Sequence, residues 1–292
     1  MKSVNKPLCI GLGEVLFDLL PDGPKLGGAP ANFAYAARAL GMDGRIISAV
    51  GDDELGKEAV RLLSDKGLPA ILPVVDRPTG NVLVTFHGRG IPSYEFAVQQ
   101  AYECIPYTED IQKLAGEADI CCFGTMAQWG KTTHETILRF LDAMRPESWR
   151  VFDVNLRGHF YNEEIIEQSL RRANAVKCNE QELPILAEYA GLPAASADAY
   201  QGYLEKLGVN CLMYTEGAKQ STVYYKGEKS ILSTPKDDVV DTVGAGDSFT
   251  AALIVSLHKG LPLSKAHERA IAVSTFVCTQ HGGMPDYGLM KR

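Results

Sequence analysis

The sequence lacks the long apolar run that a membrane span requires, since no hydrophobic segment approaches the roughly 20 residues that cross a bilayer. It also lacks an excess of positive charge, because 29 lysines and arginines against 36 aspartates and glutamates leave a net charge of −7. That balance disfavours nucleic acid and anionic membranes as partners, although a local basic pocket could still bind phosphate. Residues 1–21 contain one short apolar segment broken by glycine and acids, which predicts a first strand rather than a signal peptide.

Metal-ligand spacing is missing as well. None of the six histidines is spaced from a cysteine pair as a zinc site requires, so we expect no structural zinc. The seven cysteines are an odd number in a long chain, and Cys121 and Cys122 are adjacent within an apolar run. This pattern is typical of reduced core thiols and not of a disulfide framework. We therefore expect a globular protein of the cytoplasm.

Short apolar strands alternate with helical stretches along most of the chain. Helices are predicted over 31–40, ending at Gly41, and over 247–258, ending before Gly260 and Pro262. Such alternation implies right-handed βαβ units and a mostly parallel sheet covered on both faces, with ligands bound outside the carboxyl ends of the strands. The expected strands are 8–10, 45–50, 119–123, 151–154, 175–177 and 210–214.

The segment 71–105 has a different pattern. Hydrophobic and polar residues alternate over 81–87 and 94–96, and the run GRG at 88–90 supplies a turn between them. No helical stretch accompanies these strands. We interpret the segment as a small antiparallel lid beside the main sheet. A β-meander at the edge of the main sheet is the alternative, and hydropathy does not separate the two.

Two nucleotide-binding motifs are matched only in part. The run GDDELGK at 51–57 follows most of the P-loop pattern, but Glu58 stands where serine or threonine must bind magnesium. We expect there an ordinary strand-to-helix turn with acids at the helix N-terminus. Gly11 and Gly13 follow a strand, yet Leu16 occupies the place of the third glycine of the dinucleotide fingerprint. Neither a P-loop NTPase nor a Rossmann dehydrogenase is supported.

The strongest chemical feature is the run GAGD at 244–247, which opens the second predicted helix. Its glycines let the backbone approach a ligand closely, and the free N–H groups of the first turn, together with the helix dipole, form an anion hole. An isolated acid in a first turn would be a capping residue. An acid at the mouth of an anion hole is also placed to accept a proton from a hydroxyl that attacks a phosphoryl group. Asp247 is therefore a candidate catalytic base.

A second glycine-rich run, GGAPAN at 27–32, precedes the first predicted helix and by itself is typical of a loop-to-helix junction. Taken together, the segments 27–41 and 241–252 resemble the two signature regions of the PfkB, or ribokinase-like, carbohydrate kinase family. The second region, DTVGAGD followed by serine and phenylalanine, is highly specific. Intermediate landmarks in the same order extend the resemblance over essentially the whole chain.

The resemblance implies a single ribokinase-like α/β domain over residues 1–292, with a doubly wound, mostly parallel sheet flanked by helices. It also implies a small β-sheet lid, placed at approximately 14–26 and 71–105, that closes over the sugar and often mediates dimerisation. The expected protein is an ATP-dependent sugar kinase that works with Mg²⁺ and forms a homodimer through the lid. Neither nucleic acid nor membrane is expected as a partner.

The same resemblance assigns roles on the acceptor side of the site. Asp247 becomes the base that deprotonates the acceptor hydroxyl. Asp18, in GEVLFD at 13–18, matches the family acid that grips sugar hydroxyls, although standing alone it would be a turn residue. The backbone atoms of the anion hole belong to Gly244, Ala245, Gly246 and Asp247. The further sugar contacts implied by the family are Gly28 and Asn32.

On the nucleotide side, NEQE at 179–182 resembles the Asn-x-x-Glu element of the family. There Asn179 contacts the nucleotide and Glu182 helps indirectly to place Mg²⁺. Asn179 as N-cap with Glu182 at N3 is also a capping box, and both interpretations stay open.

Other positions match the nucleotide side less distinctively. The segment 270–283 resembles the stretch that flanks adenine, with Ile271 where many relatives have asparagine. The family often binds a monovalent cation such as K⁺ through backbone oxygens, here those of Asp241 and Val243. The implied nucleotide contacts are Thr215, Gly217 and Gly246.

The acceptor is indicated by two runs. GGAPAN at 27–32 and FDVNLR at 152–157 are most similar to the fructokinase branch. Asn155 and Arg157 follow a strand at the binding edge, where they could hold sugar hydroxyls or phosphate charge, or could cap the following helix. Fructose is the expected acceptor, and ribose, 2-keto-3-deoxygluconate and nucleosides remain alternatives.

Two rival functions belong to other classes. A catalytically silent relative acting as a regulatory protein would be signalled by loss of Asp247 or of its glycines, and all of these are present. A passive sugar- or nucleotide-binding module would show stabilisation by ligand without turnover.

Overall fold

The computed structural model describes residues 6–87, 91–236 and 238–290. Nine strands of these residues form the main sheet, and those from β13 to β6 run parallel, whereas β14 and β15 are antiparallel additions at one edge. All six strands predicted from the sequence are present, and β6, β14 and β15 are additional to them. The order across the sheet is β15 (Glu228–Ser233), β14 (Gln220–Tyr225), β13 (Cys211–Thr215), β12 (Ala175–Asn179), β11 (Trp149–Asp153), β10 (Ile120–Phe123), β1 (Leu8–Leu12), β4 (Asp43–Ile47) and β6 (Ala70–Ile71).

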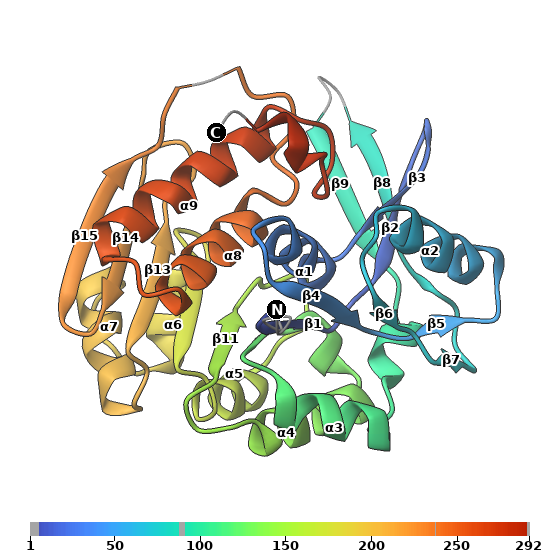
Figure 1. The fold of residues 1–292 in the computed structure, drawn as a ribbon, viewed down its shortest axis with the longest axis horizontal. Coiled ribbons are helices and arrows are strands. Elements are labelled where there is room, and N and C mark those ends of the chain that lie inside the picture. Colours follow the sequence, from blue (N-terminus) through green and yellow to red (C-terminus); the bar gives the residue numbers. More distant parts are fainter. Residues whose placement is uncertain (1–5, 88–90, 237, 291–292) are drawn as a thin grey trace, which may run out of the picture.

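Helices cover both faces of this sheet, which confirms the doubly wound α/β class (Figure 1). On each face the strands and helices share one apolar cluster, because strands buried on both sides alternate their side chains between two cores. One face carries α1 (Ala29–Ala39), α8 (Ala245–His258) and α9 (Leu263–Cys278). The other carries α3 (Glu109–Glu117), α4 (Lys131–Ala143), α5 (Glu163–Leu170), α6 (Leu183–Tyr189) and α7 (Ala197–Lys206).

The two helices predicted from periodicity are present as α1 and α8. Gly41 and Gly260 follow them with positive φ of 97° and 79°, which only glycine adopts without strain at a helix end. Helix α8 begins at Ala245, two residues before the predicted start. It is buried on nearly every side because it lies between α1, α9 and the sheet, so it shows no single apolar stripe.

A separate four-stranded sheet stands beside the main sheet, at the upper right of Figure 1. Its hairpin β8–β9 confirms the alternating pattern seen in the sequence, and the turn predicted at 88–90 lies outside the described residues. This sheet includes less of the segment 71–105 than expected. Residues 70–71 form a strand of the main sheet, and β7 (Val74–Val75) pairs with β5 (Val50–Gly51) in a separate two-stranded sheet. The strands of the four-stranded sheet in spatial order are β3 (Gly23–Gly27), β2 (Leu16–Leu20), β8 (Gly80–His87) and β9 (Ile91–Phe96).

The partial P-loop match is a helix cap. Asp53 precedes α2 (Glu54–Asp65), and its carboxylate accepts the N–H groups of Gly56 at 2.7 Å and Thr79 at 2.8 Å. These bonds use both carboxylate oxygens of Asp53, which therefore caps and stabilises the start of α2, as predicted.

The cysteines behave as predicted, since all seven are free thiols and most are buried in the strands. In the part of the chain that the structure describes, no helix is both long and apolar enough to cross a membrane.

Candidate active site

The candidate site lies where the carboxyl ends of β1, β10, β11 and β12 meet the N-terminus of α8. Strand order reverses between β1 and β10, since the chain first builds outward through β4 and later returns to add β10 and β11 on the other side. Such a reversal leaves a crevice at the carboxyl edge of a doubly wound sheet. Asn32, from the first half of the chain, and Asp247, from the second half, meet there.

The start of α8 has the geometry of an anion hole. Gly244 adopts the left-handed conformation with φ 77°, and a methyl group there would lie 2.5 Å from the Cα of Gly283. Glycine is therefore required at 244 by both conformation and space. Within the described residues, the N–H groups of Gly246 and Asp247 donate no hydrogen bond, which leaves them available to an anion.

Asp247 lies in the first turn of α8 and is held by a residue distant in the sequence. Asn32 of α1 donates from Nδ2 to Asp247 Oδ2 at 2.8 Å. Burial, with the nearby charge of Asp153, raises the pKa of Asp247 to about 6, although the Asn32 hydrogen bond and the positive charges of Lys177 and Arg157 oppose this. A carboxylate with a pKa near neutrality suits a general base. Asn32, predicted as a sugar contact, thus first of all orients Asp247.

A buried ion pair beneath the anion hole was not foreseen from the sequence. Asp153 and Lys177 are register partners on β11 and β12, with Lys177 Nζ 3.2 Å from Asp153 Oδ1 and both side chains less than a tenth exposed. A methyl group at Gly246 would lie 3.2 Å from Lys177 Nζ, so the ammonium group borders the anion hole. Burial disfavours its charge, but the carboxylates of Asp153, Glu182 and Asp247 outweigh burial and raise the pKa of Lys177. The available signal was an acid at the end of β11 and a lysine in the middle of β12, each next to buried apolar residues.

The Asn179–Glu182 turn has the reciprocal hydrogen bonds of a capping box, but α6 begins at Leu183 with Glu182 as its N-cap, so Asn179 is not the N-cap that the sequence predicted. Asn179 Oδ1 accepts the N–H groups of Gln181 and Glu182 at 2.9 and 3.0 Å, and Glu182 Oε2 accepts the Asn179 N–H at 2.9 Å. Glu182 Oε1 accepts the N–H of Leu156 at 3.0 Å, which ties the loop after β11 to this turn. Both oxygens of Glu182 therefore bind backbone, so any role toward Mg²⁺ is indirect.

The side of the site next to the four-stranded sheet contains two further carboxyls. Asp18 is on β2, and burial together with the charge of Asp241 raises its pKa. Glu14 follows β1 and is 2% exposed, and burial raises its pKa to about 7. Gly28, the N-cap of α1, has φ 117°, and a methyl group on it would lie 2.3 Å from the carbonyl oxygen of Glu14. Gly28 thus lets the start of α1 approach this strand end closely.

The loop after β11 brings a positive charge toward these carboxyls. Asn155 has φ 42°, an uncommon conformation for a residue other than glycine, and its backbone oxygen accepts the Thr125 hydroxyl at 3.4 Å. Arg157 is exposed, and its charge lowers the pKa of each of the three carboxyls Glu14, Asp18 and Asp247. Neither Asn155 nor Arg157 caps the next helix, because α5 has Asn162 as its N-cap.

The residues predicted on the nucleotide side are positioned by backbone hydrogen bonds. The carbonyl of Thr215, at the end of β13, accepts the N–H of Glu180 at 3.1 Å, which joins that strand end to the Asn179 turn. Gly217 has φ 52°, and a methyl group added to it would lie 3.3 Å from Glu180 Oε1. Ile271 is 9% exposed in the α8–α9 core, where it contributes to packing.

Asp241 closes the loop that leads into α8. Its Oδ1 accepts the N–H of Val243 and its Oδ2 accepts the N–H of Gly282, both at 3.0 Å. These bonds fix the loop 241–243 against the C-terminal segment.

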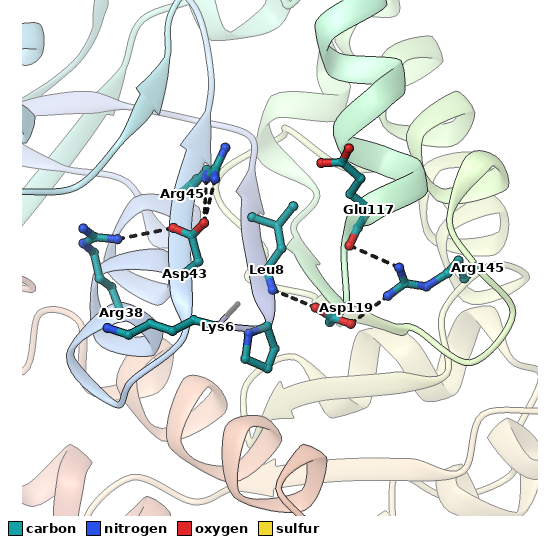
Figure 2. Close-up of a pocket in the computed structure, with 9 residues that line it drawn as sticks. Lys6, Leu8, Arg38, Asp43, Arg45, Glu117, Asp119 and Arg145 are labelled. Carbon is teal, nitrogen blue, oxygen red and sulfur yellow. Dashed lines mark hydrogen bonds and ion pairs between the residues drawn. The ribbon is translucent and has the colours of Figure 1, made fainter. Parts of the chain in front are cut away.

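A recess of about 770 Å³ lies at the opposite, amino-terminal edge of the sheet (Figure 2). There Arg38 and Arg45 approach Asp43 from two sides, and Arg145 binds Asp119, with N–O distances of 3.4, 2.6 and 2.7 Å. The charges pair with one another and tie together the starts of β1, β4 and β10. We assign this recess a structural role, because the catalytic groups are all at the other edge.

Comparison with known proteins agrees with this arrangement. Residues 24–287 match the model of the pfkB family of carbohydrate kinases. An uncharacterized sugar kinase of Pyrococcus horikoshii is 30% identical over 268 residues, which cover 88% of this chain and 81% of that protein. Its solved structure in complex with ATP has a TM-score of 0.78 at 27% identity, covering 95% of this chain and 94% of the other.

Two further relatives differ in the acceptor that their names give. A fructokinase of Escherichia coli is 29% identical over 276 residues, covering 89% of this chain and 88% of that enzyme. An aminoimidazole riboside kinase of Salmonella typhimurium is 26% identical over 302 residues, covering 97% and 92%.

Proposed function

The chain belongs to the pfkB family of carbohydrate kinases, and from this premise we propose that it transfers the γ-phosphate of ATP to a primary hydroxyl of fructose, with Asp247 as the base. One observation carries the proposal: a carboxylate with a raised pKa lies in the first turn of α8, where backbone N–H groups are free and the Lys177 ammonium borders Gly246. That arrangement places a proton acceptor beside a site for the transferred phosphoryl group.

The reaction follows from these positions. The acceptor hydroxyl gives its proton to Asp247 as its oxygen forms a bond to the γ-phosphorus, and the bond from that phosphorus to the bridging oxygen of ATP breaks. ADP leaves, and the proton passes from Asp247 to solvent. The N–H groups of Gly246 and Asp247 and the charge of Lys177 stabilise the negative oxygens of the transferred group. Asn32 holds Oδ2 of Asp247, which leaves Oδ1 for the hydroxyl.

Mg²⁺ would supply charge neutralisation on the ATP phosphates. Glu182 is buried and both of its carboxylate oxygens accept backbone N–H groups. It is therefore suited to an indirect role toward Mg²⁺, as the family implies, and not to direct coordination. Glu182 would therefore act on Mg²⁺ through the turn it holds and through water, because Mg²⁺ usually keeps several waters and binds substrate phosphates.

Fructose is supported by the names of relatives and by the two runs that resemble the fructokinase branch. A sugar acid such as 2-keto-3-deoxygluconate is the second candidate, and the observation that favours it is Arg157. Its exposed guanidinium group, in the loop after β11, donates to the Leu156 carbonyl at 3.5 Å and has no carboxylate partner among the described residues. An acceptor carrying a carboxylate would provide such a partner.

A panel of acceptors tests the proposal. With ATP and Mg²⁺, we expect sugar-dependent ADP release, with kcat/KM for fructose about tenfold or more above that for ribose and 2-keto-3-deoxygluconate. A highest value for 2-keto-3-deoxygluconate would support the Arg157 argument in place of fructose. Folded protein that releases no ADP with any sugar would favour the silent regulatory relative, and thermal stabilisation by sugar without turnover would favour a passive binding module.

The pKa of Asp247 sets an expected pH dependence. Below about pH 6 the carboxyl is protonated before the sugar binds and cannot accept the hydroxyl proton, so kcat/KM for the sugar rises as the pH increases through about 6 and then levels off. The measurement is kcat/KM for the sugar at saturating ATP between about pH 4.5 and about pH 9. A constant value across the acid side of this range would contradict a titrating base.

Two properties implied by the family complete the proposal. Asp241 and Val243 would bind K⁺ through backbone oxygens, which comparison of turnover in potassium and tetramethylammonium buffers would test. The β2–β3–β8–β9 sheet would act as the lid and as the interface of a cytoplasmic homodimer, which sedimentation equilibrium would test.

A further inference from the structure

The C-terminal segment after α9 crosses directly behind the anion hole. Gly282 donates its N–H to Asp241 Oδ2 at 3.0 Å, and the next residue, Gly283, is buried. A methyl group placed on Gly244 would lie 2.5 Å from the Cα of Gly283. Gly283 is therefore in contact with the left-handed residue that opens the anion hole.

On its other side Gly283 contacts the amide of Asn32. A methyl group added at Gly283 would lie 2.6 Å from each of three Asn32 atoms, Cγ, Nδ2 and Oδ1. Equal distances to these atoms place the methyl over the flat face of the amide. Carbon atoms prefer separations of about 3.5–4.0 Å, so the amide would have to move. Asn32 is 4% exposed within the packed N-terminal half of α1, which leaves it little room to do so without losing its bond to Asp247.

We propose that Gly283 is a positioning residue for phosphoryl transfer: its bare Cα lets the Asn32 amide lie flat against it, and the amide in turn holds Asp247 Oδ2 in place for the acceptor hydroxyl. Conformation does not explain this glycine, because Gly283 is not among the residues with positive φ. Space alone requires glycine there. The inference rests on the proposed role of Asp247 as base.

The same contact links two segments of the site that lie far apart in the sequence. Asn32 and Asp247 are 215 residues apart, and Gly283 contacts both Asn32 and the start of the helix that carries Asp247. A side chain at 283 would therefore displace the Asn32 amide and, through it, the base. An error of about 1 Å in the placement of a reacting group can cost about 100-fold in rate.

The groups that face Asp247 come from several elements and are unchanged in the variants below. A shift in the pH profile of those variants therefore reports on the Asn32 hydrogen bond. The groups are Glu14 after β1, Cys122 on β10, Asp153 on β11, Arg157 after β11, Lys177 on β12 and Tyr287 on η3 (Tyr287–Leu289).

The test is a double-mutant cycle with Gly283→Ala and Asn32→Ala. Gly283→Ala should lower kcat by about 10- to 100-fold, leave KM for ATP and sugar within about threefold, and move the acid limb of kcat/KM to higher pH. Asn32→Ala should move the limb in the same direction, since each change removes a hydrogen bond that favours the charged carboxylate. In the double variant the methyl group at 283 occupies space left by the amide, so its kcat and pH limb should equal those of Asn32→Ala alone.

Multiplicative losses in the double variant would overturn the proposal, because they would mean that Gly283 acts independently of Asn32. Wild-type kcat in Gly283→Ala would also overturn it. If Gly283→Ala does not fold, the double variant provides the test. Asn32→Ala removes the amide that the methyl group would meet, so the double variant should fold and have the activity of Asn32→Ala. Gly116→Ala is the matched control, because nothing lies within 4 Å of a methyl group there, and its activity should equal wild type.

A failure of this inference is distinguishable from a failure of the proposed function. Asp247→Asn with wild-type turnover would remove the base itself. An inactive Asp247→Asn combined with a fully active Gly283→Ala would remove only the role of Gly283.

Discussion

Replacing Asp247 with asparagine should lower kcat by about 10²- to 10⁴-fold, the range that a positioned general base contributes. Asparagine keeps the size of the side chain but cannot accept the proton of the acceptor hydroxyl. The anion hole consists of backbone N–H groups and Lys177, which this change leaves in place. The affinity for ATP should therefore not decrease, because removing a negative charge beside the phosphates reduces repulsion.

The measurement combines steady-state kinetics with calorimetric titration of ATP. Asp76→Asn is the matched control, since Asp76 is exposed and lies outside the site, and its kcat should equal wild type. Turnover of Asp247→Asn within a few-fold of wild type would remove the base assignment. A profile of kcat/KM that retains its acid limb in this variant would likewise assign the titration to another group.

Lys177→Met should have the largest combined effect on stability and turnover. The change leaves the Asp153 carboxylate buried without its ion-pair partner, which typically costs about 3–5 kcal/mol of unfolding free energy. It also removes the positive charge that borders Gly246, so we expect kcat to decrease by about 10²- to 10³-fold, as for loss of one transition-state donor. Urea unfolding and steady-state kinetics measure the two effects separately.

A second substitution separates stability from catalysis at this pair. Asp153→Asn in the Lys177→Met background removes the uncompensated carboxylate, so most of the lost unfolding free energy should return while kcat remains low. An unchanged urea midpoint in Lys177→Met would show that Asp153 does not depend on this partner. Wild-type turnover in the double variant would show that Lys177 has no part in phosphoryl transfer.

The glycine-rich start of α8 with Asp247 in its first turn could be predicted from the sequence because these features are local. The glycines, the helix start and Asp247 lie within one turn of chain, and their spacing is itself the anion hole. The hairpin β8–β9 was predictable for a similar reason, since alternation and a turn are properties of neighbouring residues.

The buried pair was not predictable in the same way. Asp153 and Lys177 become partners only through the register of β11 on β12, which depends on the whole sheet. A lysine in an apolar strand is equally compatible with an exposed edge. The Asn179–Glu182 turn shows the same limit, because only the fold revealed that the second oxygen of Glu182 holds the loop after β11.

By itself the sequence determined the α/β class, six of the seven parallel strands of the main sheet and the acid at the start of α8, because periodicity, helix-stop residues and glycine spacing act over a few neighbouring residues. The tertiary structure alone decided that Asn32 holds Asp247, that Lys177 borders the anion hole and that Gly283 lies against the Asn32 amide. Those contacts join residues far apart in the chain. They depend on how strands and helices pack, and no local pattern encodes a distance of a few ångströms between them.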